Sequence, residues 1–183
     1  MRVRPHLAVP SAHGRRDIER EDRLSSDREV ARSMQERREA RTRRSVSRRY
    51  ENASIEVKWE PEYCIHATTC WRSLPEVFRP REVPWVLPDK ANADEIAWVV
   101  AACPSGALSF RRLDGGPEEP VPDLTTVEPQ ADGPLHVRGH LRVLDAEGNV
   151  IREATRMALC RCGHSENKPF CDLSHRSSGF KAD

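Results

Sequence analysis

Four residues near the C-terminus have the types and the spacing of metal ligands. Cys160 and Cys162 are separated by one residue, so both side chains leave an extended segment on the same side. Cys171 and His175 have three residues between them, which suits a short helical turn that presents both to one centre. Three thiolates and one imidazole are enough to hold a metal ion or a small metal cluster.

Two kinds of metal centre fit this ligand set. A Cys3His set is an ordinary tetrahedral zinc site, and zinc would also stabilise a small domain. Zinc-binding knuckles, however, usually separate paired cysteines by two to four residues, whereas one residue separates Cys160 from Cys162. The spacing therefore favours an iron–sulfur cluster and leaves zinc as the alternative.

The same run resembles the CDGSH iron–sulfur domain of the mitoNEET-like family. That family has Cys-x-Cys, then Ser or Thr three residues later, then Pro-x-Cys-Asp-Gly-Ser-His. Besides the four ligand candidates, the matching positions, which we expect to support the ligands, are Ser165, Pro169, Asp172 and Ser174. The resemblance implies a 2Fe–2S cluster with Cys160 and Cys162 on one iron and Cys171 and His175 on the other. Leu173 replaces the family's glycine, so we expect a crowded turn or a shifted backbone angle there.

A second group of cysteines lies in the middle of the chain. Bacterial ferredoxins space their ligands as Cys-x-x-Cys-x-x-Cys with a distant Cys-Pro. On this pattern Cys64 and Cys70 take the first and third places, and Ala67 takes the second. Cys103, followed by Pro104, takes the last place. By themselves, three cysteines so placed are also compatible with ordinary buried thiols.

The number of irons at this middle site is left open by the sequence. Three thiolates suit a 3Fe–4S cluster, which is a cubane lacking one corner. The alternative is a 4Fe–4S cluster whose fourth ligand is His66, beside Ala67, although a surface histidine is the simpler interpretation of His66. The surrounding segments resemble a divergent single-cluster ferredoxin domain of small bacterial proteins; they are Cys64–Ala67, Leu74–Phe78, Pro84–Val86 and Cys103–Leu108. The joining of such a domain to a CDGSH domain is also familiar in bacterial proteins.

Both sites must be positioned by small elements of mixed helix and strand. Residues 55–59 alternate apolar and polar side chains, which predicts a half-buried strand. Asn92 and Glu95 resemble a capping box before an apolar helical face that runs to Cys103, and residues 107–110 indicate a returning strand. Residues 135–143 and 150 onward predict a hairpin around the turn at 145–148.

The order of these segments predicts an α+β fold in two small domains. Residues 1–49 form a basic tail, predicted to be disordered or partly helical, and residues 50–112 a ferredoxin-like cluster domain. Residues 113–134 are rich in Pro, Gly, Asp and Glu, which is typical of a linker. Residues 135–183 form a mostly β CDGSH-type domain, with little regular structure after Cys160.

Composition supports metal-stabilised domains. Hydrophobic residues make up 37% and charged residues 32% of the chain, so its cores are small and need staples such as metals. No stretch reads as a signal peptide or a membrane span, so we expect a cytoplasmic protein, where clustered cysteines more often bind metal than form disulfides. The first fifty residues hold fifteen arginines and eight acidic residues, but no interleaved aromatics that would favour nucleic-acid binding.

These features predict a non-enzymatic electron carrier. The sequence has no dinucleotide fingerprint, phosphate loop or nucleophile–base motif. We expect it to move single electrons between a reductase and an acceptor protein. The alternatives are cluster storage or transfer, redox or pH sensing, and a zinc-stabilised interaction module. CDGSH domains often pair as homodimers, and the sequence leaves this chain's oligomeric state open.

The histidine ligand generates a first prediction. Neutral imidazole donates less electron density than thiolate, and it takes up a proton near neutral pH in competition with iron. We therefore expect the His175→Cys variant to have a lower reduction potential and a cluster that is no longer acid-labile. Visible absorption followed across pH checks this, and an unchanged pH profile of cluster loss would contradict it.

Overall fold

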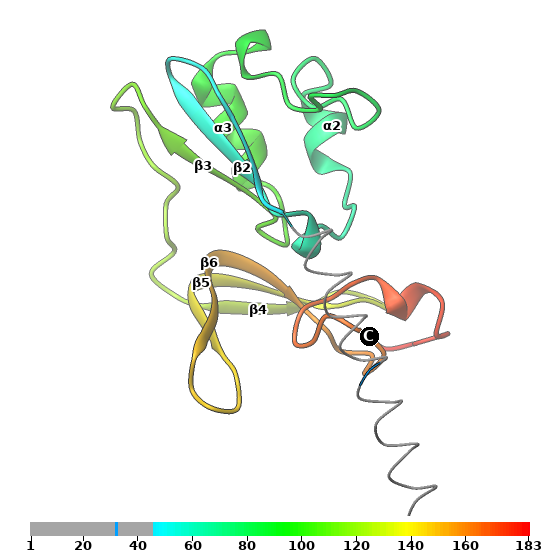
Figure 1. Ribbon diagram of the computed structural model, residues 1–183. Coiled ribbons are helices and arrows are strands. Elements are labelled where there is room, and N and C mark those ends of the chain that lie inside the picture. The colour runs from blue at the N-terminus through cyan, green and yellow to red at the C-terminus, as the bar shows by residue number, and fades with distance from the viewer. Residues whose placement is uncertain (1–31, 33–45) are drawn as a thin grey trace, which may run out of the picture. The chain divides into compact units, whose positions relative to one another are not determined.

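The computed structural model describes residue 32 and residues 46–183. Residues 46–183 form two three-stranded antiparallel sheets and a few short helices, which confirms the predicted α+β class (Figure 1). The predicted tail lies outside the described residues, apart from residue 32 and residues 46–49. Of these, Arg48 and Arg49 already belong to a strand. Within the described part of the chain, no helix has the length and apolar character needed to cross a membrane.

The first sheet has the order β1-β2-β3. Its strands are β1 (Arg48–Glu51), β2 (Ile55–Trp59) and β3 (Leu108–Arg112). The alternation at 55–59 correctly predicted β2, which lies in the centre and pairs with both neighbours. One face is polar: Glu56 is 7% exposed and pairs with Arg49 at 3.0 Å and with Arg111 at 3.5 Å.

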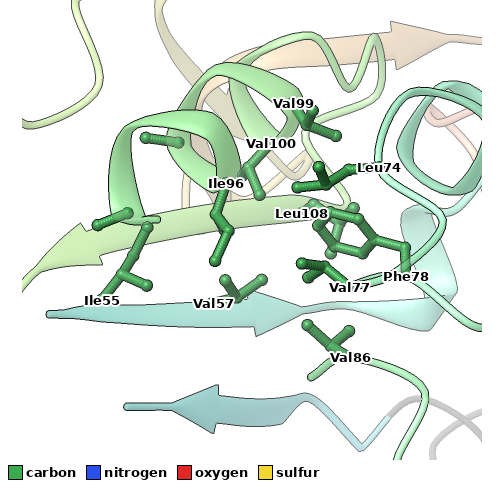
Figure 2. Packing of buried hydrophobic residues seen from close by; sticks show 12 residues of the cluster. Ile55, Val57, Leu74, Val77, Phe78, Val86, Ile96, Val99, Val100 and Leu108 are labelled. Atoms are coloured by element: carbon green, nitrogen blue, oxygen red, sulfur yellow. The ribbon is translucent and has the colours of Figure 1, made fainter. Parts of the chain in front are cut away.

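The other face of this sheet carries the main core of the first domain. Helix α3 (Ala93–Ala101) packs on it, so that Ile55 and Val57 of β2 face Ile96 and Val100 of the helix (Figure 2). The loop between β2 and α3 adds apolar residues to the same cluster: Leu74, Val77, Phe78 and Val86. Burial of these side chains is what fixes α3, and with it the turn that follows, against the sheet.

The capping box predicted for α3 is present. The Asn92 side chain accepts from the backbone N–H of Glu95 at 2.9 Å, and the Glu95 carboxylate accepts from that of Asn92 at 3.3 Å. The predicted extent of the helical face was wrong at its end. The helix stops at Ala101, so Cys103 lies beyond it in a turn. The physical reason is Pro104, which disfavours helical backbone at the residue before it.

Short elements connect β2 to α3 and carry two of the cysteines. They are η1 (Pro61–Tyr63), α2 (Thr69–Ser73) and η2 (Pro88–Lys90). Helix α2 ends at Ser73, two residues before Pro75. Residues 79–87 contain no helix and only one bridging residue, Val86, which pairs with Phe78.

The second sheet has the order β4-β5-β6. Its strands are β4 (Thr126–Pro129), β5 (Leu135–Leu144) and β6 (Val150–Leu159), and β5–β6 is the predicted hairpin. Strand β4 falls inside the segment predicted to be a linker. All four of its residues are exposed, so no apolar pattern marks it. After β6 the only regular element is η3 (Ser174–Arg176), as expected.

Strand β6 joins the two domains through a buried arginine. Arg156 is 1% exposed, and its guanidinium donates to three backbone carbonyls of the first domain. The donor–acceptor distances are 2.6 Å to Val100, 2.7 Å to Cys103 and 3.2 Å to Leu108. Glu119 balances the charge at 2.7 Å. The carbonyls of Val100 and Cys103 also accept the backbone N–H groups of Cys103 and Gly106, so a side chain of the other domain adds a second hydrogen bond to each of them.

A second arginine on the same face of β6 has a similar role. Arg152 is 6% exposed and donates to the carbonyls of Ser105 at 3.2 Å and Gly106 at 2.8 Å. Gly106 has φ of +62°, and a Cβ there would lie 2.4 Å from the carbonyl oxygen of Arg156. Only glycine therefore allows β6 to approach the Cys103 turn this closely.

Removal of the Arg156 guanidinium should destabilise the whole chain. The Arg156→Met variant removes the guanidinium from three carbonyls and leaves the Glu119 carboxylate without its cationic partner, so we expect a loss of about 3 kcal/mol in the free energy of unfolding. The matched control is Arg142→Met, since Arg142 makes an exposed pair with Glu153 that should contribute less than about 1 kcal/mol. Urea denaturation of the full chain measures both, and equal losses would contradict the prediction.

Candidate metal centres

The first half of the C-terminal site begins where β6 ends. The backbone N–H of Cys160 donates to the carbonyl of Pro169 at 2.8 Å, which closes the loop between them. The sulfur atoms of Cys160 and Cys162 lie 3.7 Å apart. Two sulfurs bonded to one tetrahedral metal at about 2.3 Å would be about 3.8 Å apart. This pair is therefore spaced to share one metal atom.

The second half of this site is a sulfur–nitrogen pair. The backbone N–H of Cys171 donates to the carbonyl of Ala158 on β6 at 2.9 Å, and η3 carries His175. The sulfur of Cys171 and Nδ1 of His175 lie 3.5 Å apart. Within the residues that the structure describes, no three His, Cys, Asp or Glu side chains are close enough to hold one metal ion together.

Backbone N–H groups surround the thiols of this site. The N–H of His164 donates to the Cys162 sulfur and that of Leu173 to the Cys171 sulfur, both at 3.4 Å. Burial raises the pKa of the Cys160 thiol, but the N–H groups of Ser165 and Gly163 outweigh it, so the pKa lies below its usual value. Such donors stabilise the thiolate, which is the form that binds metal.

The imidazole of His175 is also held in its ligating form. Burial and the neighbouring Arg176 cation both lower the pKa of His175. The neutral ring is therefore favoured, and neutral imidazole is the form that binds a metal.

The four residues predicted to support the ligands form two small hydrogen-bond networks. The Ser165 hydroxyl donates to the carbonyl of Phe170 at 2.7 Å. The Asp172 carboxylate accepts from the N–H of Glu166 at 2.8 Å and from the Ser174 hydroxyl at 2.6 Å. Pro169 supplies the carbonyl that receives Cys160. These contacts tie the ligand segments to one another.

Leu173 occupies the turn between Cys171 and His175 in a strained conformation. Its φ is +75° and its ψ is 6°, which is the left-handed region. Leucine therefore keeps the left-handed conformation that favours glycine, and the alternative of a shifted backbone angle is not what the structure shows. A non-glycine residue in this region costs roughly 1–2 kcal/mol, so something must offset the cost of leucine here.

The three middle cysteines come together around one cavity. Cys64 follows η1, Cys70 lies in α2, and Cys103 lies in the turn after α3. All three line a cavity of about 370 Å³, together with His66 and Pro104. The ferredoxin-like spacing grouped these three cysteines although Cys103 lies about forty residues after Cys64. The fold places all three around the same cavity.

Burial leaves these thiols in an environment that disfavours their charged form. It raises the pKa of Cys70 to about 11 and also raises that of Cys64. At Cys64 the backbone N–H of His66 acts in the opposite direction. Burial therefore favours the protonated thiols, and a bound cation would offset the cost of burying the thiolates.

His66 lies beside the middle site without a single clear role. Its Nδ1 is 3.9 Å from the Cys64 sulfur, and it lines the cavity, yet the residue is exposed. His66 and Thr68 both have left-handed backbone, with φ of +46° and +66°. The geometry is compatible with both interpretations made from the sequence, a fourth ligand and a surface histidine.

Two tryptophans provide a test of what the cavity holds. The indole nitrogens of Trp59 and Trp85 are buried and belong to residues that line the cavity. The Trp59 indole is directed at the Cys64 sulfur and lowers the pKa of that thiol, whereas that of Trp85 has no acceptor among the described residues. Buried N–H groups normally have an acceptor. The sulfur atoms of an iron–sulfur cluster would supply acceptors here, so the residues present fit such a cluster. The sequence pattern marked Trp59 only as a strand residue and gave no sign of this second role.

The Trp59 indole should therefore tune the potential of a cluster in this cavity. Loss of one hydrogen bond to sulfur, worth about 1 kcal/mol, should lower the reduction potential of Trp59→Phe by roughly 40 mV while the ring packing remains. The control is Trp98→Phe, because Trp98 is 69% exposed. An EPR-monitored redox titration measures both variants, and a Trp59→Phe potential equal to the wild-type value would refute this role.

Comparison with known proteins finds similarity to two families. The family described as "Divergent 4Fe-4S mono-cluster" matches residues 50–113, and the one described as "Iron-binding zinc finger CDGSH type" matches residues 132–176. The chain is also similar to the uncharacterized protein YjdI of Escherichia coli strain K12 and of Escherichia coli O157:H7. Each is 33% identical over 62 residues, which is 34% of this chain and 82% of each relative. These matches confirm both resemblances stated from the sequence.

Proposed function

Because the chain belongs to the divergent 4Fe–4S mono-cluster family and carries an iron-binding CDGSH-type domain behind that domain, we propose that it holds two iron–sulfur clusters and carries single electrons. The first cluster is bound by Cys64, Cys70 and Cys103. The second is bound by the two C-terminal pairs. The protein partners are a reductase and an acceptor.

The pairing of ligands at the C-terminal site is the observation that supports this proposal most directly. The sulfur–sulfur distance of 3.7 Å and the sulfur–nitrogen distance of 3.5 Å define two separate two-ligand units. A 2Fe–2S cluster takes two protein ligands on each iron. A single zinc ion would need all four ligands around one point. The geometry therefore favours 2Fe–2S over zinc.

The middle site supports a larger cluster. Three cysteines around a cavity of about 370 Å³, with two buried indole N–H groups on its wall, suit a cubane-type cluster. We favour 4Fe–4S, in line with the matching family, with His66 as the fourth ligand. A 3Fe–4S cluster on the three cysteines alone is the alternative.

Electron transfer, and no catalysis, is the activity that we assign. When bound, such clusters supply a one-electron couple whose potential depends on ligands, hydrogen bonds to sulfur and exposure. The chain's own contribution is to hold the ligands and to direct N–H groups, such as those of His164 and Leu173, at the sulfurs. We assign no residue as a nucleophile or a general base.

Cluster storage or delivery is a second candidate, favoured by one observation. Leu173 lies between two ligands in a left-handed conformation that glycine would adopt without strain. Strain in that turn would weaken the hold on the second cluster. Transfer of that cluster to an apo-acceptor without net electron flow would favour delivery over electron transport.

Iron and sulfide analysis of the anaerobically purified chain, together with EPR, tests the proposal. We expect about five to six irons per chain, with a 2Fe–2S signal beside that of a 3Fe–4S or 4Fe–4S cluster. Cys103→Ser should remove only the larger cluster and Cys171→Ser only the 2Fe–2S cluster. Colourless protein that contains zinc without labile sulfide would overturn the proposal in favour of a zinc-stabilised interaction module.

A further inference from the structure

The ligand-bearing loops of the two sites contact each other directly. The side-chain amide of Asn167, in the second loop, donates to the carbonyl of Glu62 in the first loop at 2.8 Å. One residue further along, the Tyr63 ring packs edge-on against that of Phe170 with centroids 4.8 Å apart. Asn167 is 6% exposed and Phe170 4% exposed, so this contact is a buried part of the fold.

The contact continues to the ligands themselves. Ile65, next to Cys64, packs with Ala158 and Cys171 in a separate apolar cluster, and Leu173 packs against it. Ile65 is 7% exposed and Cys171 is 4% exposed. A residue adjacent to one candidate ligand of the first site thus lies in the same apolar cluster as a candidate ligand of the second.

The two loops also share one depression of the surface. It has a volume of about 560 Å³ and is lined by Ile65 and Ala67 from the first loop and by Leu173 and His175 from the second. Ala67 stands where ferredoxins have their second cysteine. Ala67, at the position of the first site that lacks a cysteine, therefore lines the same depression as His175, the candidate histidine ligand of the second site.

Arg152 holds both loops in this arrangement. Its guanidinium lies 3.6 Å from the Tyr63 ring centroid and 5.6 Å from that of Phe170. The same group donates to the carbonyl of Gly106 at 2.8 Å, in the turn that follows Cys103. One buried side chain thereby fixes segments of the first site relative to the second.

We propose that this contact makes the chain an intramolecular electron relay, in which an electron passes between the two clusters across the apolar cluster of Ile65, Ala158 and Cys171, against which Leu173 packs. The proposal rests on the proposed function, since it requires both clusters. One centre loses one electron and the other gains it, and no bond or proton changes in the chain. A one-electron donor protein supplies the electron, and a one-electron acceptor protein removes it.

Leu173 and Ile65 are positioning residues in this relay. Leucine in place of glycine strains the turn, but its side chain gains the apolar contact between the loops. The apolar contact of the Leu173 side chain thus offsets the backbone strain that leucine causes in this turn. Electron tunnelling weakens steeply with distance, so loss of this packing should slow transfer even where both clusters are still bound.

EPR of the full chain with both clusters paramagnetic tests the relay. We expect a spectrum with spin–spin broadening or faster relaxation that is not the sum of the spectra of the single-cluster variants Cys103→Ser and Cys171→Ser. A spectrum equal to that sum overturns the relay. Iron and sulfide are measured on the same samples, so a missing cluster overturns the proposed function and this inference with it, whereas two uncoupled clusters overturn this inference alone.

Flash-reduction kinetics provide a second readout. In Leu173→Gly and Ile65→Ala the rate constant for transfer between the clusters should fall several-fold while both clusters remain bound. Leu144→Ala, in the exposed tip of the β5–β6 hairpin, is the control and should keep the wild-type rate. Unchanged rates in both loop variants would overturn the role of this contact.

Discussion

The buried guanidinium of Arg156 is the interaction on which most of the architecture depends. A cation that is 1% exposed must be surrounded by acceptors, and it finds them in the carbonyls that end α3 and in Glu119. The same strand that carries Arg156 leads directly into Cys160. Strand β6 therefore anchors the turn of Cys103 at one point along its length and begins the C-terminal site at its end. The geometry of each site depends on the packing of the other domain.

Much of the C-terminal site could be predicted because its candidate ligands are marked by local spacing. Cys160 and Cys162 lie on one extended segment, and Cys171 and His175 on one turn, so short-range geometry alone brings each pair together. The capping box at Asn92 and the alternation of β2 are likewise local signals. Whether the basic tail is disordered stays a prediction.

Other features could not be predicted from the sequence because they depend on contacts between segments that are distant along the chain. Arg152 and Arg156 alternate along a strand as solvent-facing residues do, and only the carbonyls presented by the other domain make their burial favourable. In the sequence Trp59 has the pattern of an ordinary strand residue, and only the structure shows that it lines the same cavity as the three cysteines. Strand β4 is exposed throughout and gains its structure from pairing with β5. Pro104 predicts the end of α3, but the helix stops at Ala101, before the end of the apolar face that runs to Cys103.

The dependence of the Cys103 turn on β6 sets an order for biogenesis. As the chain leaves the ribosome, all three cysteines of the first site emerge before Arg152 and Arg156 do. Until those arginines arrive, the carbonyls of Val100, Cys103 and Gly106 lack the guanidinium partners that they have in the finished fold. The first site therefore acquires its final form only when the C-terminal domain has been made. Both candidate sites therefore reach their final geometry at nearly the same stage of synthesis.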